Sequence, residues 1–134
     1  AILNEIDQIF EHVRLDNIAI QWDVATEMSI FEKVFPVTFK DEWEILIARL
    51  TKIGNAIPLG AELGYHLCYG SMDNKHWKEP DDLSLCMLVF NELSRCLGRE
   101  INFIHMPVPI NRVDNNYYKP LKNFHSIILT FYKH

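Results

Sequence analysis

The sequence predicts an α/β fold in which parallel strands alternate with helices along the chain. Two observations predict it: apolar residues recur with helical spacing in some segments, and short, mostly apolar runs lie between those segments. The runs expected to form strands cover residues 17–23, 61–68, 101–105 and 127–132. Because strands joined through helices pair in parallel with right-handed crossovers, this order predicts one parallel sheet. The strand at 17–23 is expected to be buried and to end in a charged residue.

Three amphipathic helices are expected, one before the first strand and two between strands. The first presents one apolar face formed by Ile2, Ile6, Ile9, Phe10 and Val13. The second begins at Asp41, which has capping-box spacing to Glu44, and Gly54 stands where a C-cap glycine belongs. The third starts at about Asp81. Residues 24–37 are ambiguous and could hold a short helix.

Length and composition limit the classes of protein. The 134 residues form one expected domain, 1–134, and an apolar content of 49% supports a packed core. A formal net charge of −5, with both signs mixed along the chain, argues against nucleic-acid binding. No apolar run is long enough for a membrane span. The first residue is Ala1, which suggests that the chain was cut from a longer protein.

The three cysteines predict a reducing compartment. An odd number at Cys68, Cys86 and Cys96 does not form a disulfide framework, so a cytoplasmic location is the simpler expectation. Cys86 falls on the apolar stripe of the third expected helix, and Cys96 falls off it. Both are interpreted as structural.

The segment from Tyr65 to Gly70 carries the most informative motif. Residues i and i+2 of a strand point to the same face, so His66 and Cys68 can both approach one zinc ion. The spacing is common by chance, and a buried histidine with a small apolar cysteine is the alternative.

Candidate acid–base and substrate residues follow the other two strands. Asp23 could bind a substrate ammonium group or transfer protons, or it could cap a helix that begins at Val24. Glu27 is its possible companion or a solvated charge. His105 precedes the proline-containing loop 106–109 and could be a proton donor, a metal ligand or a packed histidine.

Arg112 and Asp114 lie in the loop after the third strand. A guanidinium and a carboxylate at this position suit substrate recognition, and an ion pair within the loop is the ordinary alternative. The sequence holds no glycine loop for phosphate, no Gly-x-Ser-x-Gly and no CxxC, so nucleotide and serine-hydrolase functions have no support.

The motifs together resemble one enzyme superfamily. Gln21-Trp22-Asp23 with Glu27 resembles the strand-end motif of cobalamin-independent methionine synthase, and residues 65–69 resemble its His-x-Cys-Tyr segment. The order of 21–25, 64–70 and 105–109 is more similar to an uncharacterised branch described as similar to uroporphyrinogen decarboxylase and methionine synthase. The resemblance extends over about residues 1–121.

This resemblance implies the C-terminal half of a (β/α)8 barrel, about four β/α units. In the methionine synthases zinc activates a thiol for methyl transfer from a folate. By carry-over, His66 and Cys68 would be zinc ligands and Asp23 would hold an amino acid's ammonium group. The synthases add a glutamate and a later cysteine as ligands. Here His105 stands near the glutamate position, and no cysteine follows Cys96.

Three functions are therefore carried forward. The first is zinc-dependent thiol methyl transfer with Asp23 and His105 as catalytic residues, on an amino-acid thiol. The second is a metal-free decarboxylase-like activity on a carboxylate, using Asp23, His105 and Arg112. The third is a non-catalytic remnant that pairs with itself or with a missing N-terminal half, because an open sheet needs its edges covered.

Overall fold

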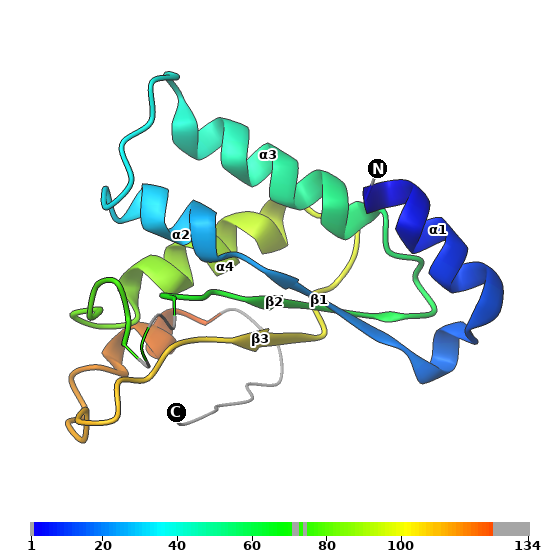
Figure 1. The fold of residues 1–134 in the computed structure, drawn as a ribbon. Coiled ribbons are helices and arrows are strands. Elements are labelled where there is room, and N and C mark those ends of the chain that lie inside the picture. Colours follow the sequence, from blue (N-terminus) through cyan, green and yellow to red (C-terminus); the bar gives the residue numbers. More distant parts are fainter. Residues whose placement is uncertain (1, 71–72, 74, 125–134) are drawn as a thin grey trace.

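A small parallel sheet lies at the centre of the chain, as the sequence predicts (Figure 1). The computed structural model describes residues 2–70, 73 and 75–124. The strands stand in the order β1 (Ala19–Asp23), β2 (Glu62–His66) and β3 (Phe103–His105), and both pairings are parallel. The strand expected at 127–132 lies outside the described residues. The α/β class and the alternation of strands with helices are confirmed.

The helices alternate with the strands and cover one face of the sheet. They are α1 (Ile2–His12), α2 (Ala25–Phe31), α3 (Glu42–Asn55) and α4 (Ser84–Cys96), with short 3₁₀ turns at Leu15–Asn17 and Lys119–Asn123. Figure 1 shows α2, α3 and α4 on the same side of the three strands. The ambiguous segment 24–37 thus contains a real helix, α2. None of the helices among the described residues is long and apolar enough to cross a membrane.

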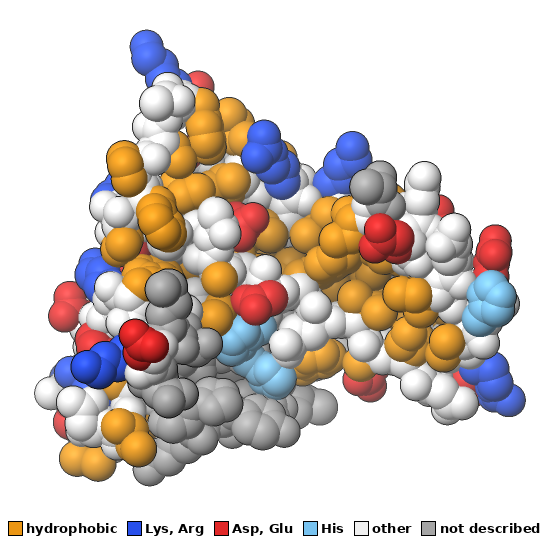
Figure 2. Space-filling view, in the orientation of Figure 1, with side chains coloured by type: hydrophobic (Ala, Val, Ile, Leu, Met, Phe, Trp, Pro, Cys, Tyr) orange, Lys and Arg blue, Asp and Glu red, His pale blue; other side chains and the backbone are white. Residues whose placement is uncertain are grey.

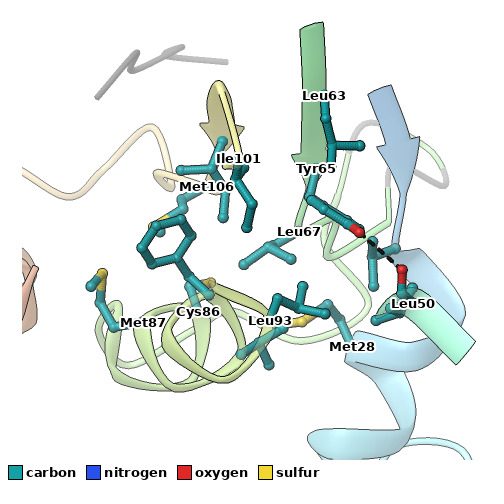
Figure 3. Close-up of a cluster of buried hydrophobic side chains, with 14 of the residues drawn as sticks. Met28, Leu50, Leu63, Tyr65, Leu67, Cys86, Met87, Leu93, Ile101 and Met106 are labelled. Atoms are coloured by element: carbon teal, nitrogen blue, oxygen red, sulfur yellow. Dashed lines mark hydrogen bonds between the residues drawn. The ribbon is translucent and has the colours of Figure 1, made fainter. Parts of the chain in front are cut away.

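Alternation along β2 builds the core between the sheet and these helices. Leu63, Tyr65 and Leu67 are fully buried on the helix-facing side (Figure 3). The Tyr65 hydroxyl donates a hydrogen bond of 2.9 Å to the carbonyl of Leu50 on α3, so the one polar atom of this ring is satisfied. The other side of β2 therefore carries the residues between them, which include Gly64 and His66.

Gly54 packs against the core and does not cap α3, so the C-cap prediction is wrong. The helix continues to Asn55, and its C-cap is Ala56. A Cβ at Gly54 would lie 2.1 Å from the Tyr65 hydroxyl and 2.8 Å from Leu97 Cδ2. Only a residue without a side chain allows this approach, which the local sequence pattern does not reveal.

Asp41 occupies the N-cap position of α3, but its side chain makes no capping hydrogen bond. Its backbone has φ 58° and ψ 39°, and the carboxylate makes no capping hydrogen bond. Because the left-handed conformation differs from the extended one in which a side chain usually reaches the first turn, the expected capping box with Glu44 does not form.

β1 and α1 are more exposed than expected. Ala19, Gln21 and Asp23 are exposed, so the prediction of a buried strand is wrong. Within the described residues β1 pairs only with β2 and forms one edge of the sheet. On α1 only Ile6 is buried, while Ile2 and two other members of its apolar stripe stay 40–51% exposed: Ile9 and Val13.

The amino-terminal edge of the sheet is tied together by Arg99. Its guanidinium donates to the carbonyls of Ile57, Pro58 and Ala61 at 2.5, 2.8 and 2.7 Å. These groups lie in the turn between α3 and β2. Charged hydrogen bonds to three carbonyls fix where β2 begins, and hence the register that brings its far end to the candidate site.

Candidate metal site

The register of the sheet brings three polar residues into one row at its carboxyl edge. Asp23 lies beside His66, and His66 lies beside His105. Cys68 follows two residues after His66, past the end of β2. In parallel α/β folds this edge is the usual place for a ligand. The register therefore brings Asp23, His66 and His105 together at one edge of the sheet.

Three of these side chains converge closely enough to share an ion. A carboxylate oxygen of Asp23, an imidazole nitrogen of His66 and the Sγ of Cys68 all lie within 4.8 Å of one another. Asp23 is exposed, and the other two are half-buried. Figure 2 shows histidine side chains beside an acidic side chain near the middle of the view. The group is therefore open to an incoming ligand.

The loop after β2 fixes the position of the Cys68 sulfur. The Gly70 backbone N–H donates to Cys68 Sγ at 3.3 Å. Gly70 has φ +76°, which places its backbone in the left-handed region, and a Cβ there would lie 2.2 Å from Trp77 Cδ1. Trp77 in turn stacks on Tyr69, with ring centroids 4.8 Å apart. Glycine is thus required at position 70 for two reasons, the left-handed backbone conformation and the close approach of Trp77.

The surroundings of Cys68 favour a cation over a free thiolate. Burial raises the pKa of the Cys68 thiol; the Gly70 N–H lowers it, and the Asp23 carboxylate raises it again. A cysteine nucleophile needs a lowered pKa, and an adjacent carboxylate works against that. A cation bound between the carboxylate and the sulfur would reverse this repulsion, because it favours both anions.

The donor set fits zinc. Imidazole nitrogen, thiolate sulfur and carboxylate oxygen are its three common protein ligands, and three protein ligands with one open position are typical of catalytic zinc. Donors of a tetrahedral zinc lie roughly 3.5 Å apart, so a separation of up to 4.8 Å requires side-chain adjustments on the order of 1 Å. A half-buried group with one exposed member can make such adjustments.

His105 lies next to this group without being a member of it. Its ring stands edge-on to that of His66 with centroids 6.0 Å apart, and it also contacts Phe103 with centroids 5.5 Å apart. His105 is half-buried. It therefore contacts one of the three candidate metal donors, His66.

Asp23 lies with the other two donors, a juxtaposition that the sequence reasoning did not foresee. It was expected to bind an ammonium group or to cap a helix, but the N-cap of α2 is Val24, and no side chain caps that helix. Glu27 lies in the first turn of α2, half-buried and outside the group of three donors. The signal that could have revealed Asp23 is that 17–23 and 61–68 end at the same edge of a parallel sheet.

Arg112 and Asp114 form the ion pair that was the ordinary alternative to substrate binding. Arg112 Nε lies 3.3 Å from an Asp114 carboxylate oxygen. The guanidinium also donates to the Asp81 carbonyl at 2.6 Å and lies 5.0 Å from the centre of the Tyr117 ring. Asp114 accepts from the Tyr117 N–H at 3.1 Å. These contacts hold the loop after β3 in place.

The other two cysteines are not members of the group of three donors. Cys86 is fully buried in the core on α4, and Cys96 is exposed at the end of the same helix. All three cysteines are free thiols.

Comparison of this chain with known proteins found no similar protein. Neither the families of known proteins, nor curated proteins, nor solved structures gave a match to this chain. The functional argument therefore rests on the site's own geometry.

Proposed function

We propose that this chain carries a zinc-dependent site for thiol alkyl transfer, of the methionine-synthase type, at the carboxyl edge of its sheet. The observation that carries the proposal is the convergence of Asp23, His66 and Cys68 within 4.8 Å. We assign Asp23 to the metal ion rather than to a substrate ammonium group, because its carboxylate lies with the other two donors.

The chemistry follows from the groups present. Asp23, His66 and Cys68 would hold the zinc ion, which would keep a substrate thiol ionised at neutral pH. His105, which contacts His66, would act as the general base that accepts the proton of the substrate thiol. The substrate sulfur would then attack the methyl carbon of a donor amine such as a folate. The new S–C bond would form as the C–N bond breaks, and the donor nitrogen would keep the electron pair and take up the proton held by His105.

The wider architecture that we propose is part of a (β/α)8 barrel. Three parallel strands in sequential order, with α2, α3 and α4 on one face and the site on the other, support this arrangement. Further strands would come from a second copy or from a longer form of the protein. Self-association without catalysis is the second candidate, favoured by the exposure of β1 at one edge.

Zinc stoichiometry of the folded protein tests the proposal. We expect about one zinc per chain, lost in Cys68→Ala and kept in Cys96→Ala, a matched control at an exposed cysteine outside the site. Asp23→Asn should weaken binding about tenfold or more, which is at least ~1.4 kcal/mol. A folded wild-type protein without zinc would overturn the metal assignment.

Cobalt substitution tests the thiol chemistry separately. With Co²⁺ in place of zinc, we expect a small amino-acid thiol to bind at the open coordination position. Its sulfur should then increase the sulfur-to-cobalt charge-transfer absorption. A spectrum that stays unchanged in excess thiol would indicate a closed, structural metal site and would contradict the alkyl-transfer proposal.

A further inference from the structure

Phe103 lies over Gly64 on the face of the sheet that carries the site. The two residues are neighbours in the β2–β3 register, two positions before the pair His66 and His105 and therefore on the same face of the sheet. A Cβ at Gly64 would lie 2.1 Å from Phe103 Cε2 and 2.2 Å from its Cζ. The ring therefore covers the glycine backbone directly, in space that any other residue at position 64 would fill.

The same ring reaches the row of the site. Phe103 contacts His105 with ring centroids 5.5 Å apart, and His105 meets His66 edge-on at 6.0 Å. His66 is one of the three converging donors. A continuous series of contacts thus runs from Gly64 through two aromatic rings to a candidate metal donor, although neither Gly64 nor Phe103 can itself bind a metal.

From this geometry we propose that Phe103, seated over Gly64, is a positioning residue that sets the ring orientations of His105 and His66 at the site. A half-buried imidazole on a sheet face has several rotamers, and metal binding selects one. The Phe103 ring restricts that choice, and Gly64 is required because it leaves room for the ring. The metal part of this inference rests on the proposed function.

A size-exchange experiment tests the inference. The variants are Gly64→Ala, Phe103→Leu, the two combined, and Gly98→Ala as a control whose added Cβ would meet nothing closer than 3.6 Å. Leucine lacks the two ring atoms that lie closest to Gly64. Two quantities are measured in each: the NMR shifts of the His66 and His105 ring protons in metal-free protein, and the affinity and visible spectrum of Co²⁺.

We expect Gly64→Ala to move the histidine ring resonances and to weaken Co²⁺ binding about tenfold. Phe103→Leu should remove the ring-current shift on His105 and broaden the Co²⁺ spectrum. The double variant should return to the level of Phe103→Leu, and Gly98→Ala should match the wild type. If Gly64→Ala does not fold, Phe103→Leu alone decides the result.

Two outcomes would overturn the inference. If Gly64→Ala or Phe103→Leu changes only the free energy of unfolding, with unchanged histidine resonances, the ring merely stabilises a glycine-containing strand. A double variant with weaker Co²⁺ binding than both single variants would also contradict it. If the wild type binds no Co²⁺, the proposed function fails, and the histidine shifts still decide whether Phe103 positions the rings.

Discussion

Gly54 shows how one residue can act against its local propensity. Glycine inside a helix costs about 1 kcal/mol relative to alanine, so the sequence of α3 alone favours replacing it. In the fold, however, the position faces the Tyr65 hydroxyl, which a Cβ would approach to 2.1 Å. That hydroxyl already donates to the Leu50 carbonyl, so it cannot move without losing a buried hydrogen bond.

We therefore predict that Gly54→Ala destabilises the protein. Overpacking costs about 1–3 kcal/mol and the lost hydrogen bond about 1 kcal/mol, which together outweigh the gain in helix propensity. Denaturant unfolding should show a net loss of about 1–3 kcal/mol. Gly98→Ala is the control and should change stability by less than about 0.5 kcal/mol. A Gly54→Ala protein as stable as the wild type would contradict this account of α3 packing.

The residues of the site were predictable in unequal measure. His66 and Cys68 were expected together from the i, i+2 rule, and they do converge although Cys68 lies just past the end of β2. Asp23 joins them only through the pairing of β1 with β2, and Phe103 covers Gly64 only through the pairing of β2 with β3. These are contacts between segments about 40 residues apart, which local patterns do not contain.

At the scale of elements, α4 shows how burial changes the ionisation of a side chain. Its residue Cys86 is fully buried, and burial raises the pKa of that thiol from the ordinary 9.0 to about 12, with the Glu32 carboxylate adding to the effect. Burial also raises the pKa values of Tyr69 and Tyr117. All three groups are held neutral in the folded state.

Stability should consequently fall in alkali. Because the pKa of Cys86 is higher in the folded state than in the unfolded state, its contribution is fully present below about pH 9. It is lost as the pH rises from about 9 to about 12, where the unfolded chain releases the proton first. We expect the free energy of unfolding to fall by a few kcal/mol across this range.

Two substitutions separate this effect from general alkaline damage. Cys86→Ala should cost about 1 kcal/mol at neutral pH through the small cavity and should flatten the decline above pH 9. Cys96→Ala, at the exposed end of the same helix, should leave the profile unchanged. Equal slopes for Cys86→Ala and the wild type would show that this thiol does not control the alkaline transition.

The exposure of β1 could not be predicted from the sequence of the strand itself. A continuous apolar run such as Ile18–Ile20 is typical of a strand buried on both faces. Within the described residues, however, β1 has one neighbour, and helices cover only one face of the sheet. The apolar run thus makes burial of the strand favourable, while the neighbouring strands and helices determine how much of it is buried.

For the molecule as a whole, the sheet face and the edges that no described helix or strand covers predict association. Parallel sheets are normally covered on both faces, and exposed strand edges pair with other chains. We expect the purified chain to form dimers or larger species at micromolar concentration, measured by size-exclusion chromatography with light scattering. A stable monomer over this range would count against both the barrel proposal and the self-association alternative.

Two matched substitutions that each add a positive charge test whether β1 forms the contact between chains. Gln21 is exposed on β1, on the face that carries Asp23, whereas Gln8 is exposed on α1. Gln21→Lys should raise the dissociation constant of the assembly about tenfold, because it places a charge against the expected partner. Gln8→Lys should leave it unchanged. Equal effects from both would indicate association through other surfaces.

By itself the sequence determined the order of strands and helices, the parallel class of the sheet and the pairing of His66 with Cys68. Each of these depends on periodicity within one segment, which the residues carry directly. Only the tertiary structure decided that Asp23 completes a group of three donors, that Gly54 packs against a tyrosine and that Arg112 is held in an ion pair. Those outcomes depend on register and close approach between distant segments, and these are fixed only when the whole core packs.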